Sequence, residues 1–413
     1  MLDIAQLNVL LHGHAIGTLT HLPGDRNLFV FNDDYIETRE RPTLSLSFRD
    51  VFGELITDIK PTQTRVPPFF ANLLPEGRMR DYLAGRADVN PQREFFLLWV
   101  LGRDLPGALE IHPTDGESWP PSAADNVRDA RDTEGEDENE KAALRFSLAG
   151  VQLKFSAVKQ ASSGLTIPVD GVGGSWIVKL PSTTYQGVPE NEYAMMELAR
   201  RVGIDVPETA LVLIDQIARL PKGVGGAGKY AFAIKRFDRD NGRERVHVED
   251  FAQVFGVYPE KKYQPASYRN IAEVIWAETG EPGITEFIRR FVFNALVGNG
   301  DMHLKNWALI YPDKRHAVLA PAYDFVSTVP YIPDEKLALN FVDAKEFNAL
   351  KIDKFGRFAA KARLPGKLVL DTVKETLDNF SHAWNASDDL PIDRTVRAAI
   401  GKHLKTIPLW KSR

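Results

Sequence analysis

The segment from Gly298 to Thr328 constrains the fold most, because it places polar residues between strongly apolar elements. It follows residues 284–297, whose apolar side chains cover most faces of a predicted helix. A buried helix that ends in Gly298-Asn299-Gly300 is a firm platform for a loop. Apolar runs at 307–311 and 316–319 flank a polar turn and predict a β-hairpin. The sequence therefore predicts helix, loop, hairpin and second loop in this order.

Three polar residues of this segment have the spacing that phosphoryl transfer requires. Asp301 opens the first loop, Asn306 follows five residues later, and Asp324 follows after eighteen more. Protein kinases use such an aspartate to accept the substrate's hydroxyl proton, and an asparagine and a second aspartate to hold magnesium. Because Asp, Asn and Gly also cap ordinary loops, the first loop alone is a weak signal. The hairpin strengthens it, since it would carry Asp324 back beside Asn306 and form one metal–phosphate centre.

The composition limits the class of protein. The 413 residues suffice for two or three domains with a sizeable core. The absence of cysteine excludes disulfides, thiolate metal sites and cysteine nucleophiles. Apolar runs stay short of the roughly 20 residues of a membrane span, and no basic segment precedes the first apolar residues as it does in a signal peptide. The net charge of -5 argues against a generally basic nucleic-acid binder, and we expect a cytoplasmic protein.

Residues 1–112 are predicted to be β-rich first and helical later. Apolar runs on both sides of His12-Gly13-His14 predict a hairpin. The other expected elements are strands at 29–31 and 44–48 and helices at 69–74, 79–84 and 93–101. His12, His14 and His21 have no cysteine or carboxylate at ligand spacing, so we interpret them as surface residues rather than a metal site.

The rest of the chain changes character three times. Residues 113–141 have few apolar and many acidic side chains, and we expect an exposed linker or insertion there. Residues 142–248 mix strands with a helix, and residues 249–413 are predicted to be almost wholly helical. Strands that precede helices indicate an α+β fold. The order fits a two-lobed, protein-kinase-like fold with a β-rich N-terminal lobe, an all-helical C-terminal lobe and a nucleotide in the cleft between them.

A lysine inside an apolar strand is the clearest charged feature of the middle region. Lys179 lies in the run Trp176–Pro181, and a buried lysine needs a partner anion. A helix is predicted to begin near Pro189, with Glu192 in its first turns. Residues 223–230 nearly match a P-loop, but a tyrosine and a strand follow the lysine, so we interpret them as a flexible hairpin tip.

Eight features of the chain, taken in order, resemble the HipA family, the serine/threonine kinase toxins of bacterial HipBA toxin–antitoxin pairs. They are the N-terminal β region and the segments Ser147–Lys154, Ile177–Pro181, Asn191–Tyr193, Arg236–Arg239, Glu249–Gly256, Gly300–Asn306 and Pro321–Asp324. Each feature alone is a weak signal, but eight of them in one order are highly specific. The resemblance covers nearly the whole chain.

The resemblance implies roles for the residues around the phosphates. Asp301 would be the catalytic base, Asn306 and Asp324 would hold magnesium at the ATP phosphates, and Lys179 would contact phosphate. The turn Ala149-Gly150-Val151-Gln152 would present backbone N–H groups to phosphate. Ser147, beside this turn, matches an autophosphorylation site whose modification would expel the loop and silence the enzyme. The alternative is a serine at a strand end that bonds only to nearby backbone.

The resemblance also implies the remaining contacts of the nucleotide. The strand that ends at Phe237 would be the hinge that reads adenine through its backbone, with Asp238 and Gln253 near the ribose. Further residues implied to bind ATP are Lys154, Lys235, His303 and Tyr323. Glu192 would pair with Lys179, and the alternative for it is a helix-cap carboxylate.

The sequence also departs from standard protein kinases. It lacks the GxGxxGxV loop and the HRD motif, and His303 beside Asp301 also resembles phosphatidylinositol kinases. Three functions remain open: an ATP- and magnesium-dependent protein kinase toxin, a small-molecule or lipid kinase with the same catalytic loop, and a co-repressor that binds a DNA-binding antitoxin. The resemblance implies as partners a small helix-turn-helix antitoxin similar to HipB, DNA mainly through this antitoxin, and a protein substrate. Aminoacyl-tRNA synthetases are the attested kind of substrate in the family.

Overall fold

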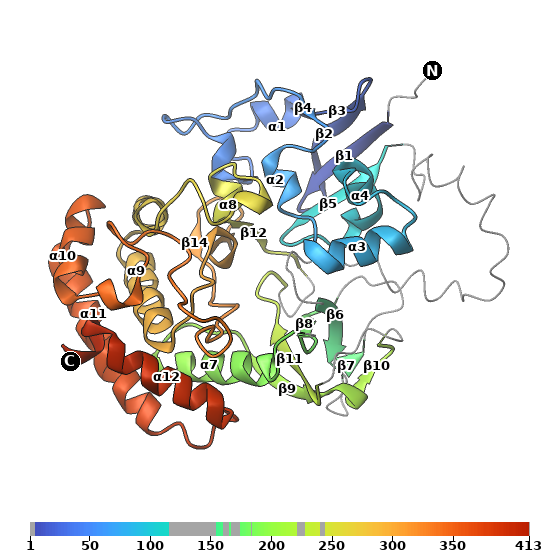
Figure 1. Cartoon of the computed structure of the whole chain (residues 1–413). Coiled ribbons are helices and arrows are strands. Elements are labelled where there is room, and N and C mark those ends of the chain that lie inside the picture. The colour runs from blue at the N-terminus through green and yellow to red at the C-terminus, as the bar shows by residue number, and fades with distance from the viewer. Residues whose placement is uncertain are drawn as a thin grey trace.

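The computed structural model describes residues 5–114, 154–159, 165–166, 174–182, 184–220, 228–239 and 244–412. Its strands are β1 Ala5–Leu11, β2 His14–Leu22, β3 Arg26–Phe31, β4 Thr62–Gln63, β5 Leu109–Pro113, β6 Lys154–Lys159, β7 Leu165–Thr166, β8 Trp176–Lys179, β9 Thr209–Leu213, β10 Ile217–Ala218, β11 Tyr230–Lys235, β12 His247–Asp250, β13 Ala308–Tyr311 and β14 Val318–Leu319. Its helices are α1 Asp33–Glu37, α2 Pro68–Ala71, α3 Gly77–Arg86, α4 Glu94–Leu101, α7 Val188–Val202, α8 Phe251–Val254, α9 Tyr268–Val297, α10 Ile352–Lys361, α11 Gly366–Asn385, α12 Arg394–Thr406 and α13 Pro408–Lys411. In Figure 1 the blue N-terminal sheet lies on one side of the molecule and the orange and red helices lie on the other.

The N-terminal region folds around an antiparallel sheet with the strand order β4-β3-β2-β1-β5. The hairpin predicted around His12-Gly13-His14 is confirmed, because β1 and β2 pair directly across it. Leu7, Val9 and Leu11 alternate along β1 and are fully buried, as one face of a sheet requires. The strand predicted at 44–48 is wrong. Residues Leu46–Phe48 form a 3-10 helix instead, and the Ser45 side chain caps its first turn.

The second sheet joins two hydrophobic cores. Its strand order is β10-β7-β6-β8-β11-β9, and α7 packs on β9 and β11. Ala231 and Ala233 of β11 face the core that is shared with the N-terminal sheet. Phe232 and Ile234 alternate with them and face the core that contains α7 and α9. The sheet therefore fixes the N-terminal region and the helical lobe relative to each other.

The C-terminal lobe is built on α9, which breaks at Gly280 and continues to Val297. In its second half Phe287 packs on Trp307 and Phe291 stacks on Phe341, with ring centroids 4.7 Å and 4.4 Å apart. The lobe is not wholly helical, because β12, β13 and β14 form a small antiparallel sheet. Strands β13 and β14 are the predicted hairpin, which is thereby confirmed. The second half of α9 matches the helix that the sequence predicts at 284–297, and its first half lies in the region predicted to be almost wholly helical.

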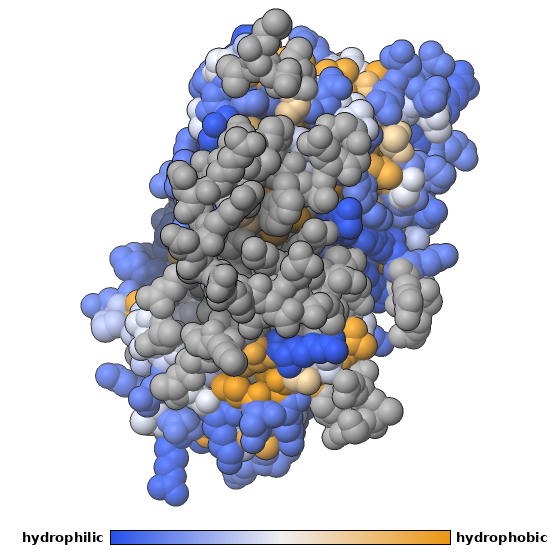
Figure 2. Space-filling model, turned by 90° about the vertical axis from the view of Figure 1, so that its right-hand side faces the viewer, coloured by the Kyte–Doolittle hydropathy of each residue, from blue (hydrophilic) through white to orange (hydrophobic). Residues whose placement is uncertain are grey.

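The surface is mostly polar where the structure describes it. Within the described ranges, no helix has both the length and the apolar character that a bilayer crossing needs. On the side of the molecule seen in Figure 2, the visible described residues are mainly hydrophilic, and apolar ones gather in small groups. Val51 and Phe52, with 93% and 85% of their surface exposed, stand out among the exposed large apolar residues.

Candidate active site

A cavity of about 330 Å³ collects residues from β8, α7, β11 and the loops that follow α9 and β14. Residues of the N-terminal region, among them Asn72 and Glu76, line another part of it. Eleven residues singled out in the sequence line this cavity: Lys179, Glu192, Lys235, Phe237, Asp238, Gln253, Asp301, His303, Asn306, Tyr323 and Asp324. The fold thus brings together these side chains from six separate segments of the chain.

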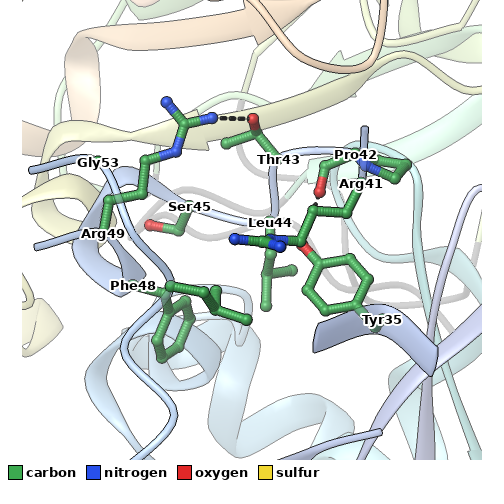
Figure 3. Close-up of a pocket in the computed structure, with 10 residues that line it drawn as sticks. Tyr35, Arg41, Pro42, Thr43, Leu44, Ser45, Phe48, Arg49 and Gly53 are labelled. Atoms are coloured by element: carbon green, nitrogen blue, oxygen red, sulfur yellow. Dashed lines mark hydrogen bonds between the residues drawn. The ribbon is translucent and has the colours of Figure 1, made fainter. Parts of the chain in front are cut away.

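A second cavity lies in the N-terminal region and is too small for a nucleotide. Figure 3 shows its lining, in which Arg49 points to Thr43 and donates a hydrogen bond to its hydroxyl. The Tyr35 hydroxyl donates to the carbonyl of Pro42 at 2.6 Å. The volume of this cavity is about 30 Å³, which is the share of a single water molecule. The large cavity is therefore the candidate active site.

Lys179 is the electrostatic centre of the large cavity. Its ammonium group donates to the carboxylates of both Glu192 and Asp324. Burial alone would lower the pKa of Lys179, but the two carboxylates outweigh it and raise the pKa, so the lysine keeps its charge. Glu192 lies inside α7. The N-cap residue of this helix is Gly187, and no side-chain hydrogen bond caps the helix there. The structure therefore places Glu192 on Lys179 and not at the helix cap.

The backbone of Asp324 adopts the left-handed conformation, with a φ of 58°. Non-glycine residues reach this region rarely, and aspartate tolerates it better than most. Asp324 follows Tyr323, whose hydroxyl donates to the carbonyl of Lys305 at 2.9 Å. This contact joins the second loop to the first, as the predicted hairpin requires, and it brings Asp324 to the same cavity as Asn306.

The loop after α9 is held by its own polar side chains. Gly298 caps the helix with a φ of 70°, and the Asn299 side chain accepts the backbone N–H of Asp301 at 3.0 Å. Asn306 Nδ2 donates to the carbonyl of Asp301 at 2.7 Å and closes the loop. Because Nδ2 is engaged in this bond, the amide oxygen of Asn306 is the atom that remains for a metal. The motif therefore has a structural use as well as a chemical one.

The side chain of Asp301 is half-buried and accepts a hydrogen bond from the hydroxyl of Tyr263 at 2.5 Å. Burial raises the pKa of Asp301, and the hydrogen bond from Tyr263 opposes this rise. His303 lies beside them and is buried, which lowers its pKa to about 3. Its Nδ1 is buried and has no hydrogen-bond partner within the described structure, and the residue lines the large cavity.

Two of the expected ribose contacts are engaged elsewhere. Asp238 bonds to the guanidinium groups of Arg236 and Arg239 and accepts the backbone N–H of Gly107 at 2.8 Å. Burial alone would raise the pKa of Asp238, but the two arginines lower it, so the carboxylate stays charged. This network holds the hinge strand against the N-terminal region.

Gln253 is the other expected ribose contact. Its side chain closes a capping box with Asp250 at the start of α8 and donates to the carbonyl of Phe69 at 3.1 Å. Phe237 lines the cavity, with its ring centroid 5.7 Å from that of Tyr323, and its role as a hinge stays a prediction. Lys235 ends β11 and lines the cavity with it.

A cluster that local sequence patterns did not reveal lies beside the Asp301 loop. Glu76 of the N-terminal region forms ion pairs with Lys262 and Lys305, each at 2.8 Å. Burial would raise the pKa of Glu76, but the two lysines lower it to about 2. Lys305 also donates to the carbonyl of Asn72 at 3.1 Å. Two ammonium groups thus share the one carboxylate of Glu76, and this trio of side chains has a net positive charge near the proposed base. Only Lys305 had a signal in the sequence, since it lies inside the Asp301–Asn306 motif.

Asn306 and Asp324 suit a magnesium ion that arrives with a nucleotide. In the described part of the chain, no three His, Asp or Glu side chains gather into a complete metal site. Magnesium in phosphoryl transfer uses one or two carboxylates and completes its shell with water and substrate phosphates. An amide oxygen and a carboxylate on adjoining loops fit this pattern.

Some predicted residues lie outside the described part of the structure. They are Ser147, Ala149, Gly150, Val151 and Gln152, together with the acidic segment 113–141 except its first two residues and the near P-loop at 223–227. The backbone of Lys154 begins β6, where it pairs with Lys179 of β8. The roles inferred for all of these residues stay predictions.

Comparisons with known proteins agree with this architecture. A family model described as the HipA N-terminal domain matches residues 7–112, and one described as the HipA-like C-terminal domain matches residues 146–384. The chain is 53% identical over 415 residues to "Putative kinase Y4dM" of Sinorhizobium fredii, covering 100% of this chain and 99% of the relative. It is 25% identical over 340 residues to "Serine/threonine-protein kinase toxin HipA" of Shewanella oneidensis, covering 76% of this chain and 75% of the relative.

A solved structure has the same fold. It is a chain of the Shewanella oneidensis MR-1 toxin–antitoxin complex of HipA, HipB and operator DNA, and it superposes with a TM-score of 0.72 at 21% identity. The match covers 98% of this chain and 96% of that chain. The fold is therefore the expected two-lobed, kinase-like α+β fold. Since the two family models together span most of the sequence, the chain belongs to the HipA family and carries the N-terminal and C-terminal domains of that family in order.

Proposed function

We propose that this chain is an ATP- and magnesium-dependent serine/threonine protein kinase that acts as the toxin of a type II toxin–antitoxin pair. The observation that carries the proposal is the Lys179 bridge between Glu192 and Asp324, in one cavity with Asp301 and Asn306. A lysine, a metal-binding aspartate and asparagine, and a base are the parts that phosphoryl transfer uses. The fold and the relatives named as kinases support the same activity.

Each residue has a defined task in the proposed reaction. Asp301 accepts the proton of the attacking hydroxyl, and Lys179 faces the phosphates with its positive charge. Asn306 and Asp324 would hold magnesium, which supplies neutralisation of the phosphate charge. The backbone after β11 would receive the adenine. His303 lines the same cavity and would contact the nucleotide.

The partners are proposed from the relatives. The solved Shewanella complex contains HipA, HipB and operator DNA, and we infer a small helix-turn-helix antitoxin for this chain, with DNA bound mainly through it. The substrate would be a cellular protein, with aminoacyl-tRNA synthetases as the first candidates. Ser147 is proposed as an autophosphorylation site. Incubation with ATP and magnesium followed by mass spectrometry would locate the phosphate.

The replacement Asp301→Asn tests the activity. It should leave folding and ATP binding largely intact and abolish transfer, because an amide cannot accept the proton. Labelling of a cell lysate with radioactive ATP would show phosphate on a protein with the wild type and not with the variant. A rate of phosphate transfer by the variant within about threefold of the wild-type rate would contradict the assignment of Asp301 as the base. Label found only on small molecules would favour a small-molecule kinase. Expression of the variant should also permit growth if the wild type arrests it.

A further inference from the structure

The hydrogen bond between Tyr263 and Asp301 has no part in the reaction described so far. The tyrosine hydroxyl donates to Oδ1 of the proposed base at 2.5 Å. A base in phosphoryl transfer has to lie within hydrogen-bond reach of the hydroxyl whose proton it takes. The position that an acceptor hydroxyl needs is therefore already filled by a hydroxyl of the chain itself.

The segment that carries Tyr263 is anchored next to it. Lys262 is buried, its ammonium pairs with Glu76 at 2.8 Å, and its carbonyl accepts the backbone N–H of Leu304 at 3.2 Å. This arrangement holds the backbone of residue 262 against both the N-terminal region and the Asp301 loop. The base therefore receives the Tyr263 hydroxyl from a segment whose backbone is fixed.

The side chain of Tyr263 is much less enclosed than its backbone. It is 42% exposed, and its ring meets that of His303 edge-on at a centroid distance of 4.9 Å. The following residues, Gln264 and Pro265, are exposed as well. Rotation of one side chain therefore suffices to release Asp301, and no packed element has to move.

We propose that Tyr263 is an internal stand-in for the acceptor hydroxyl, and that a protein substrate displaces it from Asp301 when it binds. This inference rests on the proposed kinase function and adds a regulation of the same site. In the closed arrangement the Tyr263 hydroxyl occupies Oδ1 of the base, where an attacking water would have to lie. In the open one, a water oxygen bonds to the γ-phosphorus of ATP while Asp301 takes its proton. The bond to the β-phosphate oxygen then breaks, so that ADP and phosphate leave.

When the Tyr263 hydroxyl competes for Asp301, the apparent affinity for the substrate hydroxyl falls in proportion to the fraction of protein molecules in which Asp301 is open. The variant Tyr263→Phe keeps the ring against His303 and removes the hydroxyl. The probe is a synthetic peptide that copies residues 142–155, whose Ser147 supplies the hydroxyl. Measured by fluorescence anisotropy without nucleotide, the variant should bind it about three- to tenfold more tightly than wild type.

Tyr258→Phe is the matched control, since it removes a hydroxyl from the same connection between α8 and α9. The Tyr258 ring lies under the guanidinium of Arg65 at 3.9 Å, and phenylalanine keeps that contact. The control should bind the peptide as wild type does. Equal or weaker peptide binding by Tyr263→Phe would overturn the proposal.

Kinetics with magnesium and ATP give a second readout. Tyr263→Phe should lower the KM for the peptide with little change in kcat, and it should hydrolyse ATP several-fold faster without peptide, because water reaches the base. A fall in kcat with unchanged peptide binding would make Tyr263 a positioning residue instead and would overturn the stand-in role. Tighter peptide binding without phosphate transfer by either protein would support the stand-in and count against the kinase.

Discussion

At the scale of single residues, Lys179 shows what a sequence can and cannot reveal. A lysine within an apolar strand had to have an anionic partner, and this requirement could be read from local sequence. Its partners could not be derived in that way, because Glu192 and Asp324 lie 13 and 145 residues away along the chain. The family resemblance alone implied the pair of Lys179 with Glu192, and only the structure revealed the pair of Lys179 with Asp324. The contact of Tyr263 with Asp301 could not be predicted, since the local sequence around an exposed loop tyrosine does not show whether a carboxylate lies beside its hydroxyl.

The variant Asp324→Ala tests the metal at this scale. It removes a carboxylate oxygen that suits a hard cation, so nucleotide affinity in millimolar magnesium should fall by about tenfold or more. Calorimetric titration of ATP at several magnesium concentrations measures the effect. Glu192→Gln is the matched control, because it removes the other carboxylate on Lys179 and should keep the dependence on magnesium. Affinity that is unchanged by Asp324→Ala at every concentration would contradict the assignment.

At the scale of elements, local patterns predicted most of the helices and strands, because hydrophobic periodicity acts within one element. The hairpin of β1 and β2, both halves of α9 and the pairing of β13 with β14 followed from it. The error at 44–48 has a long-range cause. Ser45 and the backbone of Leu46 donate to the carboxylate of Glu249, at 2.5 Å and 3.0 Å, so tertiary contacts override the apparent strand.

The break in α9 gives the prediction at this scale. Gly280 has a φ of 64° and a ψ of -151°, a region that is open essentially to glycine alone. No atom lies within 4 Å of the Cβ that alanine would add, so the cost of Gly280→Ala is backbone strain, on the order of 1–3 kcal/mol. Gly356 of α10 also has open space at this position, and Gly356→Ala should instead stabilise the protein by up to about 1 kcal/mol. Urea denaturation followed by circular dichroism compares the two, and shifts of the same sign would refute the strain argument.

At the scale of the whole molecule, the N-terminal region helps to line the candidate active site. Glu76 and Asn72 contact the lysine next to Asn306, and Glu249 of β12 binds residues 45 and 46. The Tyr311 hydroxyl also donates to Glu249. These contacts join parts of the chain that are far apart in sequence, and periodicity within an element cannot show them. The order of the lobes was readable from the sequence, but their contacts were not.

The buried carboxyl of Glu249 makes the stability of this assembly depend on pH. Burial raises the pKa of Glu249 to about 7 from an ordinary 4.5, although its hydrogen bonds oppose the rise. The folded protein thus favours the protonated form. The resulting stabilisation is fully present below about pH 4.5 and is lost as the pH rises through about 7. Protonation of Glu249 thus contributes on the order of 3 kcal/mol to the free energy of unfolding.

Glu249→Gln imitates the protonated form and should remove this dependence. Its unfolding free energy should equal that of wild type near pH 4 and exceed it by about 3 kcal/mol near pH 8. Denaturation curves of both proteins across this range provide the measurement. A difference in unfolding free energy between the two proteins that stays constant at all pH values would argue against a protonated carboxyl at Glu249.

The Lys179 bridge also determines which anions the cavity attracts before any substrate arrives. Its ammonium charge is already compensated by two carboxylates, so inorganic phosphate or free polyphosphate finds little net attraction at Lys179 itself. If Asp324 holds magnesium as proposed, a nucleotide that brings this cation would replace the lysine on Asp324, and Lys179 would then be free to face the phosphates. In the proposed kinase, metal and nucleotide would therefore enter as a pair, and the Lys179 bridge would discriminate against phosphates that come without a metal.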